Sequence, residues 1–160
     1  SFHTNGQLRV RGFYTDGVKN GQQEMFNDRG ILIAQVTYKS GIRDGGYISY
    51  DTDGKIELMG RYVNGQKNGA VEGFMSTGEK GFTGNYLNDL AQGKHSVYSL
   101  DGQTRASWFC DSGLIVDKSL KNYTDLKFSP ARMESFRFKP CEEILSHWWH
   151  SPFEELGIGL

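Results

Sequence analysis

Apolar and polar residues alternate along the first part of the chain in short runs that are separated by glycine-containing turns. In the first such stretch the runs cover residues 8–14 and 22–26, and Asp16-Gly17 and Asn20-Gly21 lie between them. Alternation with a period of two predicts β-strands, and Asp-Gly and Asn-Gly supply the positive φ angles of tight turns. We therefore predict a β-hairpin, and the density of glycine argues against helix.

The hairpin recurs every 24 residues through residues 1–117, five times without slippage. The first aromatic column and the glycine column four residues behind it are complete: Phe2, Phe26, Tyr50, Phe74, Tyr98, then Gly6, Gly30, Gly54, Gly78, Gly102. The second aromatic column ends in a cysteine: Tyr14, Tyr38, Tyr62, Tyr86, Cys110. Two further glycine columns are each broken once, by Asp89 and by Asp117. Such a period is typical of repeat proteins, in which each unit packs on its neighbours. We predict an all-β array of stacked β-hairpins.

Alternation also separates two faces of the predicted sheet. One face would hold the second aromatic column and the positions of the first run that are apolar in successive units: Leu8, Leu32, Ile56, then Val10, Ala34, Leu58, Phe82. Glycine recurs on this face at Gly12, Gly60 and Gly84, so we expect a neighbouring aromatic ring to lie over the backbone there. The other face is mixed and does not repeat. Its side chains are free to recognise a partner, or they form ordinary solvated surface.

Residues 118–160 change in character, because glycine is absent until Gly157 and all three prolines of the chain lie here. We predict a capping segment for the last repeat, with a short helix that begins at Pro140 and ends before Pro152. The apolar stretch that contains Trp148 and Trp149 would be either part of this buried cap or an anchor for a partner.

Bulk composition narrows the function. Residues 1–117 carry 12 basic and 13 acidic side chains and residues 118–160 carry 6 of each, so neither region has the basic footprint of a nucleic-acid-binding protein. No apolar run is long enough to span a membrane, and residues 1–6 do not resemble a signal peptide. Cys110 and Cys141 form either one disulfide or two buried thiols.

The sequence lacks a recognisable catalytic or cofactor motif. His147 and His150 are spaced to share a metal, but no cysteine or carboxylate pattern completes a site, and a surface pair on the predicted helix is the plainer interpretation. No phosphate-binding glycine loop and no Gly-x-Ser-x-Gly nucleophile motif occurs. We therefore predict a protein that is not an enzyme and that has no catalytic residue, metal or cofactor.

The spacing aromatic-x-x-Gly-x-x-x-Gly-x-x-x-x-aromatic, present as Tyr14, Gly17, Gly21 and Phe26, resembles the MORN repeat. The phrases YVNGQKNG, YKSGIRDG and YDTDGKIELMGRY resemble more closely the bacterial MORN variant of YwqK-type antitoxin or immunity proteins. This resemblance covers residues 2–117. It implies an elongated, single-layer antiparallel sheet that binds a partner and has no enzymatic activity.

The bacterial MORN-variant proteins that these repeats resemble include immunity proteins that neutralise secreted antibacterial toxins, among them type VI secretion effectors such as phospholipases. The resemblance therefore implies that the chain occludes a cognate toxin. The compartment stays open, with the bacterial periplasm slightly favoured over the cytoplasm. The alternative, implied by eukaryotic MORN arrays, is a scaffold or a lipid-surface module. The expected contact residues lie on the non-repeating face: Arg9, Arg11, Phe13, Glu57, Met59, Arg61, Arg105. The oligomeric state stays open.

Overall fold

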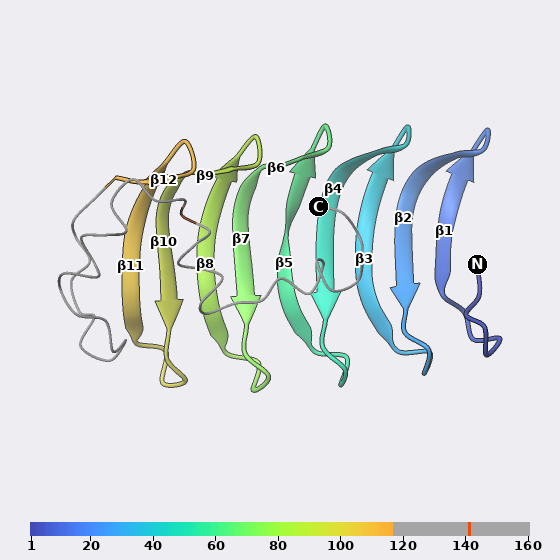
Figure 1. Ribbon diagram of the computed structural model, residues 1–160, viewed down its shortest axis with the longest axis horizontal. Helices are drawn as coiled ribbons and strands as arrows, with labels where there is room; N and C mark the ends of the chain where they lie inside the picture. Colours follow the sequence, from blue (N-terminus) through green and yellow to red (C-terminus); the bar gives the residue numbers. More distant parts are fainter. Residues whose placement is uncertain (117–140, 142–160) are drawn as a thin grey trace.

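The computed structural model describes residues 1–116 and Cys141, and residues 1–116 form one elongated antiparallel sheet of successive hairpins (Figure 1). The predicted all-β fold of stacked hairpins is thereby confirmed. The predicted capping segment and helix within residues 118–160, with His147, His150, Trp148 and Trp149, lie outside the described residues apart from Cys141.

The twelve strands of this sheet follow the chain in simple up-and-down order, without a crossover. The ten that make up the continuous path are β1 (Val10–Thr15), β2 (Val18–Phe26), β3 (Leu32–Lys39), β4 (Ile42–Tyr50), β5 (Ile56–Val63), β7 (Gly69–Phe74), β8 (Lys80–Leu87), β10 (Gly93–Tyr98), β11 (Thr104–Asp111) and β12 (Leu114–Ile115). Two short strands lie off this path: β6 (Gln66–Lys67) beside β5 and β9 (Leu90–Ala91) beside β8.

Each repeat closes at a hairpin tip with a two-residue turn, and the tips form the upper edge of the sheet in Figure 1. In the first tip Asp16 and Gly17 have φ angles of 50° and 78°. Both are in the left-handed region, which aspartate and glycine tolerate best. Neighbouring tips are tied together, because the amide of Gly41 donates to the carbonyl of Lys19 over 2.8 Å. The same bond joins each later tip to the one before it: Gly65 to Arg43, Asp89 to Lys67, Gly113 to Ala91.

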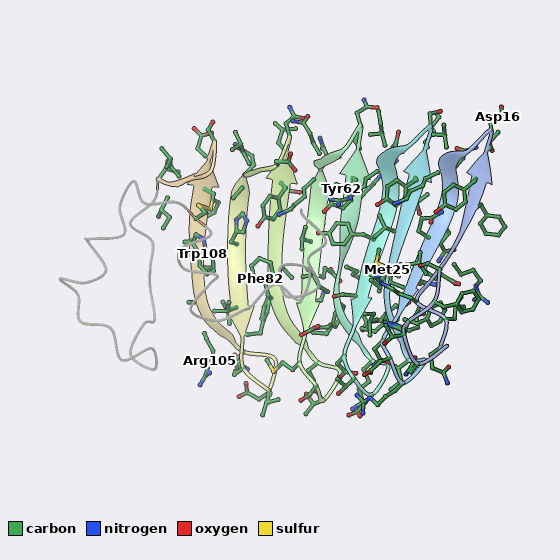
Figure 2. All side chains as sticks on the ribbon, turned by 45° about the vertical axis from the view of Figure 1, so that its right-hand side comes forward. Asp16, Met25, Tyr62, Phe82, Arg105 and Trp108 are labelled. Carbon is green, nitrogen blue, oxygen red and sulfur yellow. A yellow bond between two sulfur atoms is a disulfide. The ribbon has the colours of Figure 1, made fainter. Side chains whose placement is uncertain are left out.

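We call the side of the sheet that carries Ala34, Leu58 and Phe82 the packed face, and all three of these side chains are buried. Figure 2 labels Tyr62, Phe82 and Trp108, which lie along this face on β5, β8 and β11. The alternation of the sequence therefore assigns the middle of each strand to the correct face. The buried residues of the face include both halves of the repeat: Ala34, Val36, Tyr47, Ser49, Leu58, Tyr62, Val71, Phe82, Tyr86, His95, Val97, Ala106, Trp108, Cys110.

One column of the predicted packed face is misplaced. Leu32 pairs with Phe26 and Ile56 pairs with Tyr50. In both cases the residue that follows Leu32 or Ile56 is the extra residue of a β-bulge and is left out of the pairing of the two strands. Cross-strand partners share a face, so the bulge turns this column, together with the first aromatic column, to the opposite side. Ile56 is accordingly 38% exposed. A bulge inserts a residue without interrupting the sequence pattern, so alternation alone does not reveal it.

The glycines of the packed face make room for the side chain on the neighbouring strand. A Cβ at Gly60 would lie 2.5 Å from the Tyr47 hydroxyl oxygen, as the predicted packing of ring over backbone requires. At Gly84 the neighbours are His95 and Phe82, but at Gly12 the neighbour is the amide of Gln23 rather than a ring. The prediction of an aromatic ring is therefore wrong for the first repeat.

This close packing makes Gly60→Ala a sensitive test of the packed face. Overpacking a core typically costs about 1 to 3 kcal/mol, and the Tyr47 ring has no space to retreat because it also packs 4.9 Å from Tyr62. We expect a loss of this size in the free energy of unfolding measured by urea denaturation. Gly46→Ala is the matched control, because nothing lies within 4 Å of a Cβ there. Equal losses in the two variants would contradict the packing described.

A ladder of cations and tyrosines near the tips was not foreseen from the sequence. Lys19 lies 4.8 Å from the centre of the Tyr38 ring, and Arg43 lies 5.4 Å from that of Tyr62. Lys67 repeats the contact over the next tyrosine of the column, Tyr86, at 5.2 Å. Such contacts stabilise by about 0.5 to 1 kcal/mol each at exposed sites. These three cations are spaced by 24 residues and so occupy one column of the repeat, and this spacing could have been recognised in the sequence.

Candidate partner-binding face

We call the opposite side of the sheet the open face, and its middle is a row of directly paired residues that crosses nine strands. Because paired residues share a face, the register of the strands defines this row without ambiguity. From β1 to β11 it consists of Arg11, Glu24, Gln35, Ile48, Met59, Glu72, Thr83, Ser96, Ser107. Of these nine side chains only Ser96 is buried. The middle of the open face is thus a continuous surface whose side chains differ from one repeat to the next.

The predicted contact residues fall into three groups along this surface. Residues 9–13 lie on or next to β1, residues 57–61 lie on β5, and Arg105 lies on β11. Four strand spacings separate the first group from the second and the second from the third, or about 19 Å in each case. A standard interface covers about 800 Å² of each partner and is therefore roughly 28 Å across. One partner of ordinary size can cover two of these groups but not all three.

Within each group the side chains differ in setting. Phe13 is 69% exposed and Met59 is 36% exposed, and both are large apolar groups of the kind that anchors protein interfaces. Glu57 and Arg105 are the extra residues of two β-bulges. They lie toward the edge opposite the hairpin tips, where Figure 2 labels Arg105 at the far end of its strand from the tip. Bulges commonly change the direction of a side chain, so these two residues lie at the border of the open face rather than in its middle.

A hydrogen-bonded network organises the open face near its first edge, and sequence reasoning missed all but one of its members. The Nε of Arg11 donates to Oε2 of Glu24 over 2.7 Å, and the Nε2 of Gln35 donates to Oε1 of Glu24 over 3.3 Å. The Tyr50 hydroxyl donates to Oε1 of Gln35 over 2.6 Å. The Arg11 guanidinium also lies 5.6 Å from the centre of the Phe26 ring. Cross-strand pairing joins these residues in space, whereas in sequence they are far apart.

The network holds its groups in defined positions and charge states. Partial burial, together with the nearby Glu24 carboxylate, raises the pKa of Tyr50 above its ordinary value, so this hydroxyl stays protonated and donates. Farther along the face Lys80 pairs with Glu72 over 2.8 Å, and the hydroxyls of Thr83 and Tyr98 lie 3.0 Å apart. Both carboxylates of the central row are therefore already matched by a cation.

The comparisons with known proteins name no family. No family model matches this chain, and no curated protein is significantly similar to it. A solved structure that matches is the crystal structure of a GtfA/B complex bound to UDP and GlcNAc, with 19% identity and a TM-score of 0.33 over 68% of this chain. This chain spans about a fifth of that one, since the match covers 21% of its length.

Within residues 1–116 and Cys141 no group of three or more histidine, cysteine, aspartate or glutamate residues is placed to hold a metal ion. Over the same residues no helix is long and apolar enough to cross a membrane. The one fully buried histidine of the packed face, His95, is enclosed by aromatic rings. Its ring lies 5.9 Å from that of Trp108, 5.8 Å from that of Tyr86 and 6.1 Å from that of Phe82.

Burial lowers the pKa of His95 below 6.5, and the contact of its Nδ1 with the carbonyl of Gly93 at 3.2 Å opposes this only in part. As the pH falls below 6.5 the unfolded chain therefore binds a proton more readily than the folded chain. The stability contributed by this site is fully present above about pH 7 and declines toward pH 5. We expect His95→Gln to flatten this part of the stability profile, measured by urea denaturation between about pH 5 and pH 7. An unchanged slope in the variant would show that His95 is not the titrating group.

The two cysteines form a disulfide, which decides between the two interpretations left open by the sequence. Cys110 of β11 and Cys141 are bonded across a separation of 31 residues, and both are buried. The amide of Cys141 also donates to the carbonyl of Gly113 over 2.8 Å. Cys141 is therefore attached to the last hairpin at its tip as well as through sulfur. Among the described residues no cysteine is free.

Proposed function

We propose that this protein is a bacterial immunity protein, or antitoxin, that binds a cognate toxin on its open face and occludes it. The observation that carries the proposal is the contrast between the two faces. Residues that recur with the 24-residue period bury the packed face, whereas the central row of the open face is accessible apart from Ser96 and its side chains change from each repeat to the next. The first aromatic column, which also recurs, lies on the open face only at the edge opposite the tips. In a repeat protein the positions that hold neighbouring units together are constrained, and the remaining positions are available for recognition.

The composition of the open face agrees with a protein-binding role. It presents arginines, Met59 and exposed phenylalanines, which are enriched at protein interfaces, on a rigid support. The resemblance of the repeats to the MORN variant of immunity proteins supports a toxin as the partner. Binding by occlusion requires no catalytic group on this chain, so we propose that it is not an enzyme.

The disulfide supports a periplasmic place of action. Disulfides persist in oxidising compartments and are rare in the cytoplasm of mesophilic bacteria. Toxins delivered from a neighbouring cell, such as phospholipase effectors of type VI secretion, would meet an immunity protein in the periplasm. We therefore propose that the protein neutralises its toxin there.

Co-expression tests this function directly. Each protein encoded next to this gene would be produced in a host, in the cytoplasm and with export to the periplasm, with and without the present chain. We expect one neighbour to inhibit growth and this chain to restore growth and to co-purify with it. The matched control is a chain with Phe13→Asp and Met59→Asp, which alters the open face only. Failure to rescue or bind any toxic neighbour would contradict the proposal.

A second candidate function, a lipid-surface or scaffold module, has one observation in its favour. An exposed aliphatic side chain occupies the same position in four of the five hairpin tips: Val18, Ile42, Leu90, Leu114. The tips are joined by hydrogen bonds, so these groups form a line along one edge of the sheet. Liposome flotation tests this candidate. Flotation with phosphatidylcholine vesicles that is lost in Ile42→Glu and Leu90→Glu would favour it over toxin binding.

A further inference from the structure

The centre of the open face contains one arginine that stands apart from its neighbours. Arg61 of β5 is exposed and pairs across the sheet with Gly46 of β4. On the other side the register shifts by two residues between the pair Met59–Glu72 and the pair Tyr62–Lys67, so Arg61 lies opposite the segment 68–70, and the amide of Asn68 donates to the carbonyl of Arg61 over 2.9 Å. Arg61 is therefore flanked by Gly46 on β4 and, on its other side, by a segment that contains Gly69 and Ala70.

These small residues place no long side chain beside Arg61, and we call this low part of the open face the notch. Nothing lies within 4 Å of a Cβ built on Gly46, and Ala70 is exposed. The equivalent positions of the first and fourth repeats carry long side chains, Gln22 and Lys94, so the notch belongs to the middle of the array. Its apolar border is formed by Ile48 and Met59 of the central row, which are direct cross-strand partners.

The positive charge of Arg61 makes the notch favour an acidic group. The two carboxylates of the central row, Glu24 and Glu72, are held by Arg11 and Lys80 at 2.6 Å and 2.8 Å. Arg61 makes no ion pair with any residue of the part that the structure describes. An arginine presents a planar fork that matches a carboxylate with two parallel hydrogen bonds. The unmatched cation at the centre of the face is thus complementary to an acidic group.

We infer that Arg61 is the central contact of the open face and receives an aspartate or glutamate side chain of the protein partner. An apolar residue beside that acid covers Ile48 and Met59, while Gly46 and Ala70 admit the acidic side chain to the depth of the guanidinium. This inference rests on the proposed function and adds to it the chemistry of the partner: an acidic surface with an apolar neighbour. Arginine at the centre of an interface, shielded by surrounding contacts, is a common hot spot.

Binding of the toxin found by co-expression, measured by calorimetry with purified proteins, tests the inference. We expect Arg61→Ala to raise the dissociation constant by about 30-fold or more. Arg61→Lys keeps the charge but loses the fork, so we expect an intermediate loss. Ala70→Leu fills the notch without changing charge, and we expect at least a 10-fold loss with an unchanged melting temperature. The matched control is Lys94→Ala, an exposed cation at the same height of the face, for which we expect less than a threefold change.

The outcomes separate the two levels of the proposal. A toxin that binds the wild-type chain, and binds Arg61→Ala and Ala70→Leu equally well, overturns the inference and leaves the immunity function intact. Equal losses in Arg61→Ala and Lys94→Ala also overturn it, because they indicate attraction by net charge rather than a specific contact. If no neighbouring protein binds the wild-type chain, the proposed function fails and the inference fails with it.

Discussion

Trp108→Ala is expected to lower the free energy of unfolding by about 3 to 5 kcal/mol, because it removes the largest fully buried side chain of the described residues. The indole stacks on His95 within the sheet, so its removal leaves a cavity that flanking strands cannot close without breaking their hydrogen bonds. Urea denaturation followed by circular dichroism measures the loss. We expect the midpoint to fall with little change in slope.

The adjacent residue provides a matched control for this variant. Phe109 follows Trp108 on β11, is also aromatic, and points to the open face, where it is 38% exposed against 0% for Trp108. We expect Phe109→Ala to cost about 1 kcal/mol or less, because surface substitutions generally have small effects. A loss at Phe109 as large as that at Trp108 would contradict the assignment of the two faces.

Removal of the disulfide is expected to have the second large effect. For a loop that joins residues 31 positions apart, the chain-entropy model gives about 3 to 4 kcal/mol. Cys141→Ser should lower the free energy of unfolding by this amount in oxidising buffer. The reason is that the bond restricts the unfolded chain and that Cys110 and Cys141 are both buried.

Reduction supplies the control for the cysteine variant. A reducing agent should lower the stability of the wild-type chain to that of Cys141→Ser and leave the variant unchanged. If the reducing agent has no effect on the wild-type chain, the disulfide does not contribute to stability in solution. The lost stability would also reduce rescue of a host from a periplasmic toxin, and this loss would be independent of the open face.

The hairpin array could be predicted because its determinants are local. Turn residues such as Asp16 and Gly17 specify where each strand ends, and alternation between them specifies which side chains share a face. The repetition of these signals at a constant interval confirms each one through the others. The fold of such a sequence can be predicted because its local preferences and its global packing agree.

The finer details depend on cross-strand register, which is not local. The bulges that turn Leu32 and Ile56 to the open face are defined by how two strands pair, and the alternation within either strand alone does not reveal them. The network from Arg11 to Tyr50 joins four strands through side chains that are unremarkable individually. The disulfide depends on the position of Cys141, far along the chain from Cys110.

The candidate site was predicted in part. Sequence alternation identified Arg11, Met59 and Arg61 as members of the non-repeating face, and the register places all three there. Sequence could not show that the cross-strand partner of Arg61 is a glycine, because Gly46 comes from another strand. It also gave no distances between the three groups of predicted residues, which the order of the strands now separates.

Hydroxyl-radical footprinting of the chain, free and bound to its toxin, shows directly whether the open face is the binding surface. We expect binding to protect Met59, together with Phe13 or Phe109, on the open face. The buried rings of the packed face, Tyr47 and Tyr62, should show equally low reactivity in both states. Protection confined to the hairpin-tip residues Ile42 and Leu90, with Met59 unchanged, would show that the partner does not bind the open face.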